Sequence, residues 1–202
     1  ASFFVNTDED NNQIASFYTG AMAHAGKLSF TANAPDADLT IITPNDPGAM
    51  LNYVRECKQI GLPYIYDPSQ QTARISGEEI REGIDGCYLL SSNEYEFQLI
   101  QEKTGLSESQ ILDRVGGLVM TMGPAGSRLV IDGREEFVPV APTRWVAEPT
   151  GAGDAYRAGL MRGMQLGLPW GIAGRMGALA AAYVLEQYGP QNHYFTREEF
   201  VA

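Results

Sequence analysis

Cysteine and histidine are both scarce in this chain, which has only two of each among its 202 residues. The cysteines, Cys57 and Cys87, are far apart and show no C-x-x-C or Cys/His spacing. Structural zinc sites and redox-active pairs need such spacing, so the sequence indicates neither. Both cysteines fall in apolar segments, which predicts two reduced, buried thiols in a cytoplasmic protein.

Positive charge is also sparse. Lys and Arg together number 14 against 25 Asp and Glu, which gives a formal net charge of -11. The chain contains no run of Lys or Arg. Because nucleic-acid backbones and anionic membranes are usually bound through such runs, we expect neither as a partner.

Long apolar segments and two common catalytic motifs are missing as well. The sequence has no long uninterrupted apolar span and does not open with a basic region followed by an apolar one. We therefore expect neither membrane insertion nor secretion. The absence of G-x-x-x-x-G-K-[ST] argues against a Walker-type NTPase, and the absence of G-x-S-x-G argues against an α/β-hydrolase.

What the chain does have is a regular alternation of strand-like and helix-like segments. Strands are predicted at Ser2–Val5, Ile14–Tyr18, Leu39–Thr43, Pro63–Tyr66, Cys87–Leu90, Leu118–Met122, Ser127–Ile131 and Glu135–Val140. Helices are predicted at Gly48–Ile60, Gly77–Glu82, Asn93–Lys103, Ser107–Val115, Ala152–Gly167 and Trp170–Gln187. This pattern favours a single three-layer α/β domain over residues 1–202, with a mostly parallel sheet and helices on both faces. In such sheets, ligands bind beyond the carboxyl ends of the strands.

Two further local predictions follow from the pattern. Residues 1–22 read as a lid or edge hairpin, because two short strands flank an Asp/Asn-rich turn. Asp8, Asp10 and Asn12 alternate as in a calcium loop, but the glycine and distal glutamate of an EF-hand are missing, so a turn is favoured over a calcium site. In the last long helix we expect a core-facing set of residues, Ile172, Met176, Leu179, Ala180, Tyr183 and Val184.

The most informative stretch is P-T-G-A-G-D-A-Y-R-A-G at residues 149–159. Gly151 and Gly153 allow a tight turn into a helix, whose first N–H groups lack internal partners and attract an anion such as phosphate. Asp154 in the first turn is positioned as a base for an incoming hydroxyl. Simple helix capping is the alternative interpretation of Gly-Ala-Gly-Asp. Arg157 is either a phosphate contact or an ion-pair partner of Asp154.

Two other motifs follow predicted strands. Asn93 and Glu96 have the spacing of a helix capping box, and the same pair could orient a hydrated Mg²⁺. Thr121, Gly123 and Gly126 lie in a turn before a predicted hairpin, where small residues would let a nucleotide approach the backbone. Asn192 and His193 could close a base pocket, or could be polar loop residues without a role.

Together these motifs resemble the PfkB (ribokinase-like) carbohydrate and nucleoside kinases. The resemblance rests on the P-T-G-A-G-D-A-Y-x-A-G signature, the N-x-x-E pair and the T-x-G-x-x-G loop, and more softly on residues 7–22, which look like adenosine-kinase-like members. It implies a ribokinase-like fold with ATP and Mg²⁺ as cofactors. Asp154 would be the base, with an anion hole at Gly151, Ala152 and Gly153. It further implies a nucleotide loop at Thr121, Gly123 and Gly126, a base pocket near Asn192, and a magnesium contact, mainly through water, at Asn93 and Glu96.

The resemblance covers only the C-terminal two-thirds of the family pattern. The first strand, the Gly-Gly-x-x-x-Asn type substrate motif and several lid strands have no counterpart here, so the chain is expected to be a fragment or a shortened relative. An uncovered sheet edge predicts self-association into a homo-oligomer. Two functions remain open at this point. One is transfer of the γ-phosphoryl group of ATP to a hydroxyl of a sugar or nucleoside, with adenosine-like acceptors favoured; the other is a non-catalytic nucleotide-binding or oligomerising remnant.

Overall fold

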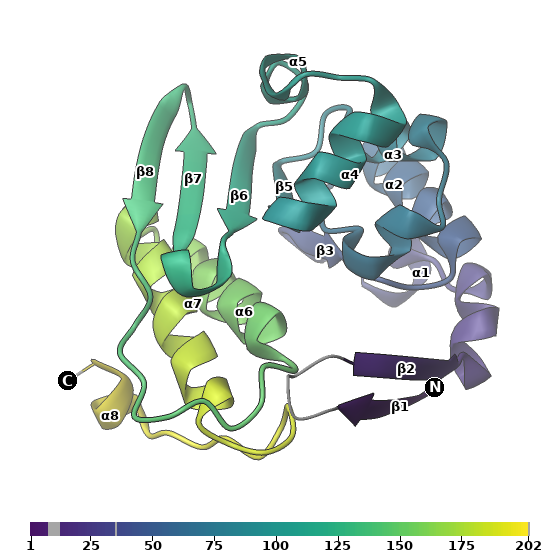
Figure 1. The fold of residues 1–202 in the computed structure, drawn as a ribbon. Helices are drawn as coiled ribbons and strands as arrows, with labels where there is room; N and C mark the ends of the chain where they lie inside the picture. Colours follow the sequence, from purple (N-terminus) through teal and green to yellow (C-terminus); the bar gives the residue numbers. More distant parts are fainter. Residues whose placement is uncertain (8–12, 35, 202) are drawn as a thin grey trace. The chain divides into compact units, whose positions relative to one another are not determined.

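The computed structural model describes residues 1–7, 13–34 and 36–201. The strands, as drawn in Figure 1, are β1 Ser2–Thr7, β2 Gln13–Tyr18, β3 Thr40–Ile42, β4 Tyr64–Tyr66, β5 Leu89–Asn93, β6 Gly117–Thr121, β7 Ser127–Ile131 and β8 Arg134–Val138. The α-helices are α1 Phe30–Asn33, α2 Pro47–Ile60, α3 Gly77–Ile84, α4 Glu94–Thr104, α5 Glu108–Leu112, α6 Ala152–Gln165, α7 Trp170–Leu185 and α8 Arg197–Val201. Three 3₁₀ helices complete the set, η1 Gly20–Lys27, η2 Ser69–Ala73 and η3 Gly123–Ala125.

The boundaries of the helices follow local capping chemistry. Asp46 caps α2 by accepting a hydrogen bond from the Ala49 N–H, Pro47 takes the first helical position, and Gly61 ends the helix at a left-handed φ of 70°. Ser76 begins α3 with a capping box completed by Glu79. These signals are local, which explains why the predicted and observed ends of α2 nearly coincide.

The main sheet has the strand order β3-β4-β5-β6-β7-β8. The pairs β3–β4 and β5–β6 are parallel, whereas β6–β7 and β7–β8 are antiparallel. The β7–β8 turn is formed by Asp132 and Gly133, whose φ angles of 50° and 70° suit a tight two-residue hairpin. The predicted α/β class with a mostly parallel sheet is confirmed. β1 and β2 form a separate antiparallel hairpin, as expected; Asp8, Asp10 and Asn12 lie outside the described residues.

The chain divides into two compact units, residues 1–88 with 99–114, and residues 89–98 with 115–202. In the first unit, α2 buries Met50, Val54 and Cys57, and all three residues of β4 are buried. In the second, β5, β6 and β7 contribute buried Leu89, Leu118 and Leu129. The single domain expected over residues 1–202 stays a prediction.

The two cysteines are free and buried, as predicted. Burial raises the pKa of Cys57 to about 11 and that of Cys87 to about 12. Both thiols are therefore protonated near neutral pH and are poor nucleophiles.

The prediction for the buried face of α7 was right for Ala180 and Val184, which are buried, and wrong for Ile172; Met176, Leu179 and Tyr183 are half-buried. Ile172 is 43% exposed, whereas the buried residues are mostly small ones, namely Gly171, Ala173, Gly174, Gly177, Ala180, Ala182 and Val184. The helices α6 and α7 lie side by side in Figure 1, and glycines line their contact. A Cβ on Gly159 would stand 2.5 Å from the Met176 carbonyl oxygen. Close approach of two backbones, rather than interlocking of large side chains, therefore sets this interface.

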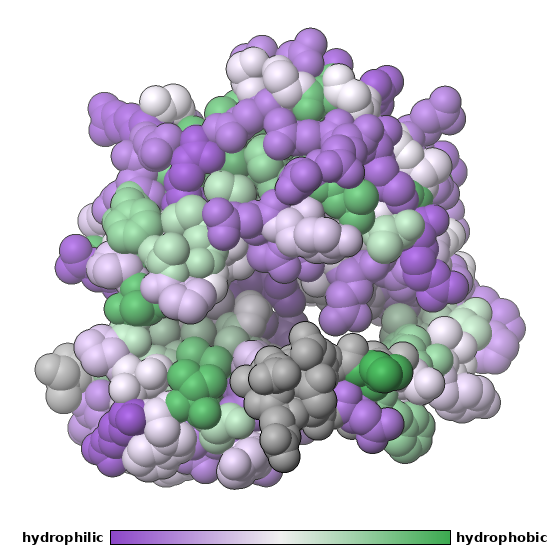
Figure 2. All heavy atoms as spheres, viewed as in Figure 1, coloured by the Kyte–Doolittle hydropathy of each residue, from purple (hydrophilic) through white to green (hydrophobic). Residues whose placement is uncertain are grey.

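Within the described part of the chain, no helix is long and apolar enough to cross a membrane. Hydrophilic residues cover most of the face drawn in Figure 2, with hydrophobic residues in smaller groups between them.

Candidate active site

The N-terminus of α6 begins at a glycine turn. Gly151 occupies the N-cap position at φ 90° and contributes no side-chain cap. The Ala152 N–H donates to the Pro149 carbonyl at 3.2 Å, so this member of the predicted anion hole is engaged in the turn itself. The N–H groups of Gly153 and Asp154 have no acceptor among the described residues. Two adjacent donors at the positive end of a 14-residue helix make a suitable place for an anion.

The fold requires glycine at one of the two glycine positions of this turn but not at the other. Gly151 has a left-handed backbone, and a Cβ there would lie 2.6 Å from the Cβ of Pro190. Gly153 has an ordinary helical conformation, and the nearest atom to a Cβ there would be Arg157 Nη1 at 3.7 Å. Because alanine is the better helix former, the fold itself gives no reason for glycine at position 153. A ligand that approaches the backbone at Gly153 would explain why this position lacks a side chain.

Asp154 projects from the first turn of α6 into solvent. Its side chain is 77% exposed, and Arg157 Nη2 donates to its Oδ1 at 2.5 Å. The Arg157 side chain is only 18% exposed. Of the two roles predicted for Arg157, the structure thus contains the ion pair with Asp154, which fixes one carboxylate oxygen and leaves the group accessible.

Asn93 and Glu96 form a reciprocal capping box where β5 passes into α4. The Asn93 N–H donates to Glu96 Oε2 at 2.9 Å, and the Glu96 N–H donates to Asn93 Oδ1 at 2.8 Å. The capping interpretation is therefore correct. Capping does not exclude a role in orienting a hydrated Mg²⁺, because each side-chain oxygen that caps the helix can accept a further hydrogen bond.

The loop after β6 carries the third motif. Thr121 ends β6, Gly123 begins the single turn of η3 at φ 54°, and Gly126 follows that turn at φ 99°. A Cβ on Gly123 would meet nothing within 4 Å, whereas a Cβ on Gly126 would stand 2.3 Å from the Val138 carbonyl oxygen. The close packing of β8 therefore explains Gly126. The open side of Gly123 fits the predicted approach of a nucleotide.

The sheet register brings these motifs to one edge. Asn93 pairs with Thr121 across β5 and β6, and Thr121 pairs with Ser127 across β6 and β7. Ser127 Oγ and Tyr156 Oη share a hydrogen bond of 2.6 Å, which ties this edge to the first turns of α6. Burial raises the pKa of Tyr156, so its phenol is neutral. Neither Ser127 nor Tyr156 is among the predicted site residues, although Tyr156 follows Asp154 by two positions.

The segment of the second unit that contains Asn192 lies against the turn before α6. Pro190 would contact a Cβ on Gly151, and the Gly189 N–H donates to Glu148 Oε2 at 2.8 Å. Asn192 is exposed, and its Nδ2 donates to the Tyr188 carbonyl at 2.6 Å. His193 stacks on Phe195, with ring centroids 6.1 Å apart. A base pocket at Asn192 stays a prediction.

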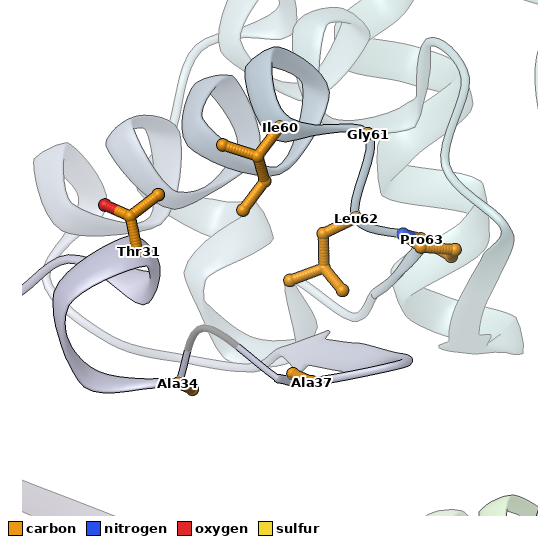
Figure 3. Close-up of a pocket in the computed structure, with 7 residues that line it drawn as sticks. All are labelled: Thr31, Ala34, Ala37, Ile60, Gly61, Leu62 and Pro63. Carbon is orange, nitrogen blue, oxygen red and sulfur yellow. The ribbon is translucent and has the colours of Figure 1, made fainter.

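A cavity of about 290 Å³ lies in the first unit. Figure 3 shows that it is lined mainly by small and aliphatic residues, Thr31, Ala34, Ala37, Ile60, Gly61, Leu62 and Pro63. None of the predicted site residues contributes to it. The candidate active site is therefore defined by the motifs at the strand ends and at α6.

Comparison with known families matches residues 2–197 to the pfkB family carbohydrate kinases. The chain belongs to the pfkB family. The predicted resemblance is thus confirmed. A nucleoside kinase of Methanocaldococcus jannaschii is 31% identical over 98% of this chain and 65% of its own length. One from Methanothermobacter thermautotrophicus is 29% identical over 94% of this chain and 62% of its own length.

Solved structures agree with the family assignment. Burkholderia thailandensis nucleoside kinase in complex with inosine has a TM-score of 0.88 and 34% identity, covering 98% of this chain and 65% of that one. The same enzyme in its ADP-inosine complex gives a TM-score of 0.87 and 35% identity, covering 97% of this chain and 61% of that one. The chain thus spans a little under two-thirds of the length of these relatives.

Proposed function

We propose that this pfkB-family chain carries the phosphoryl-transfer machinery of an ATP-dependent nucleoside kinase, which moves the γ-phosphoryl group of ATP to a hydroxyl of a nucleoside. The observation that carries the proposal is the exposed carboxylate of Asp154 at the start of α6, beside the backbone N–H groups of Gly153 and of Asp154 itself, which have no acceptor among the described residues. The nucleoside kinases among the relatives, and the inosine complexes of the Burkholderia enzyme, favour a purine nucleoside over a free sugar. An adenosine-like acceptor is consistent with this.

In this proposal each residue has one role. Asp154 accepts the proton of the attacking hydroxyl, and Arg157 holds the carboxylate in place through its ion pair. The N–H groups of Gly153 and Asp154 stabilise the charge on the transferred phosphoryl oxygens. Gly151 gives the turn its direction and Gly153 leaves the approach to these donors clear.

The residues at the sheet edge fit a nucleotide and a hydrated cation. Gly123 offers an open backbone beside Thr121, suited to the close approach of ATP. The described residues contain no group of three His, Cys, Asp or Glu that could cage a metal ion. Mg²⁺ keeps several waters and is bound largely by phosphates, so it does not need such a group. Asn93 and Glu96, at this edge of the sheet, would orient those waters. When bound, Mg²⁺ would neutralise charge on the nucleotide phosphates.

The test is Asp154→Asn. The substitution keeps the size of the side chain and its hydrogen bond to Arg157 but removes the base, so we expect phosphoryl transfer to fall by about a hundred-fold or more while ATP affinity changes little. ADP formation is measured with Mg²⁺, ATP and a panel of inosine, adenosine, cytidine and ribose; ATP binding is measured by calorimetry. Turnover close to that of the unsubstituted chain would eliminate Asp154 as the base.

The second candidate is a nucleotide-binding module without catalysis. The observation that favours it is the span of the chain, which covers under two-thirds of its relatives. ATP binding by the unsubstituted chain with no acceptor-dependent ADP would support this candidate, whereas ADP formation that requires a nucleoside would exclude it.

A further inference from the structure

We propose that the hydrogen bond between Tyr156 and Ser127 is a positioning device that fixes the catalytic turn of α6 against the nucleotide loop. The inference rests on the proposed kinase function and adds two residues to it. Tyr156 and Ser127 are positioning residues here, because they act through Asp154 and Gly123 rather than on the reacting atoms.

The position of each partner links one part of the site to the other. Tyr156 follows Asp154 by two residues on α6, and Ser127 is the residue directly after Gly126 at the end of the nucleotide loop. Their oxygens are 2.6 Å apart, and the two residues are 6% and 1% exposed. A buried bond of this kind is difficult to replace by water, so it holds α6 and the loop in one relative position.

The loop end of the bond is itself firmly held. Ser127 pairs with Thr121 on β6 and with Val138 on β8, and the Met122 N–H donates to the Gly126 carbonyl at 2.8 Å. A shift of Ser127 would therefore move the whole turn that contains Gly123. Because the Ser127 hydroxyl is hydrogen-bonded to Tyr156, the position of that turn is coupled to the position of α6.

The helix end of the bond is held by α7. Gly177 leaves space for Tyr156: a Cβ on Gly177 would stand 2.7 Å from the Tyr156 carbonyl oxygen and 3.1 Å from its Cδ2. A Cβ on Gly174 would stand 3.5 Å from the Tyr156 Oη, an ordinary contact, and 2.7 Å from Val138 Cγ2. The ring therefore lies in a slot that Gly177 leaves open, with its hydroxyl directed at Ser127. A phenylalanine would fill the same slot but could not make the bond.

Correct alignment matters for phosphoryl transfer because small errors between nucleophile, base and phosphoryl group reduce the rate steeply. We expect Tyr156→Phe to lower kcat by about three- to thirty-fold, with KM for the nucleoside unchanged. The matched control is Tyr183→Phe on α7, which removes a hydroxyl that donates to the Glu199 carbonyl in the same unit. The control should leave kcat unchanged.

A double variant separates positioning from stability. Tyr156→Phe leaves the Ser127 hydroxyl buried without its partner, so its Tm falls; Ser127→Ala with Tyr156→Phe removes both groups, so its Tm should return close to that of the unsubstituted chain. If the bond positions the site, kcat stays low in the double variant. If kcat recovers together with Tm, or never falls in Tyr156→Phe, the proposal is wrong.

A second readout distinguishes failure of this proposal from failure of the kinase assignment. If the unsubstituted chain shows no acceptor-dependent turnover, the proposed function fails, and hydrogen exchange of residues 122–127 then decides the structural claim alone. Faster exchange in Tyr156→Phe than in Tyr183→Phe supports the linkage between loop and helix. Equal exchange in the two variants overturns it.

Discussion

At the scale of single residues, the glycines of α6 divide into those that the fold requires and one that it does not. Gly159 and Gly163 face α7 at distances that leave no space for a Cβ. Gly153 is exposed at the start of the same helix, and the nearest atom to a Cβ there would be Arg157 Nη1, at an ordinary contact distance of 3.7 Å. The same substitution at two positions of one helix can therefore separate function from packing.

We expect Gly153→Ala to stabilise the chain by up to about 1 kcal/mol, because alanine is the better helix former and its Cβ would make no contact closer than 3.7 Å. The same change should slow phosphoryl transfer by about ten- to a hundred-fold, because the new methyl group would obstruct the backbone donors. The matched variant Gly159→Ala should instead lose about 1–3 kcal/mol, since its Cβ would press on the Met176 carbonyl. Denaturant titration and ADP release measure the two effects, and a stabilised Gly153→Ala with full activity would contradict the ligand role of this glycine.

At the scale of elements, the short helix α1 is held by a carboxylate from a neighbouring helix. Glu56 of α2 accepts hydrogen bonds from the Phe30 N–H at 2.9 Å, the Thr31 N–H at 3.0 Å and the Ser29 hydroxyl. The Ser29 hydroxyl, then the Thr31 N–H, lower the pKa of Glu56 from 4.5 to about 2. A four-residue helix makes few hydrogen bonds of its own, so this carboxylate determines whether α1 stays folded.

The pH dependence of α1 follows from the sign of that shift. Because the folded pKa lies below the unfolded one, the stabilisation by Glu56 is complete above about pH 4.5 and is lost as the pH falls toward 2. We expect Glu56→Gln to lower Tm at pH 7 and the difference from the unsubstituted chain to narrow steadily below pH 4.5. Glu78→Gln, at an exposed position on α3, is the control. A Tm difference that stays constant between pH 7 and pH 3 would refute this assignment.

Elements defined by local chemistry could be predicted from the sequence, and those defined by tertiary packing could not. Three features depend only on residues within a few positions of each other and could therefore be predicted from the sequence: the ends of α2, the Asp132-Gly133 hairpin and the turn into α6. On α7 the prediction found the buried Ala180 and Val184 but included the exposed Ile172 and left out the glycines, because hydrophobicity does not indicate where the backbone of α6 approaches closely. β5 begins two residues later and ends three residues later than predicted, because Asn93 completes the strand before it caps α4.

The candidate site shows the same division. Asp154, Gly151, Asn93 and Glu96 are located by short motifs, and the structure places them at strand ends or at a helix start. Ser127 and Tyr156 are far apart in sequence, and only the register of β6 with β7 and the packing of α6 bring their hydroxyls together. A sequence pattern contains no signal for such a pair.

At the scale of the whole molecule, the β1–β2 hairpin exposes large apolar side chains. Phe4, Ile14 and Tyr18 fall on one face in the observed register and are 66%, 80% and 69% exposed. Phe3 and Phe17 pair on the other face and are 45% and 48% exposed. A two-stranded ribbon with apolar residues on both faces gains stability from a partner, so the homo-oligomer stays a reasonable prediction.

We expect the chain to associate with rising concentration, and Phe4→Ser with Ile14→Ser to shift it toward the monomer. Light scattering after gel filtration measures the change. Leu166→Ser, which removes a 51%-exposed leucine just beyond α6, is the control and should have no such effect. A monomer at all concentrations before any substitution would disprove the expectation.

The contact between α6 and α7 also bears on how this sequence can diverge. Because backbone atoms of one helix approach those of the other at Gly159 and Gly163, a larger residue at either position would force the helices apart and carry the carboxylate at the head of α6 with them. Arg162 and Gln165 lie on the exposed side of the same helix, where the Arg162 side chain donates to that of Gln165, and they impose no such constraint. Substitutions that accumulate over time in α6 should therefore concentrate on its outer side, whereas the inner side stays restricted to the smallest side chains.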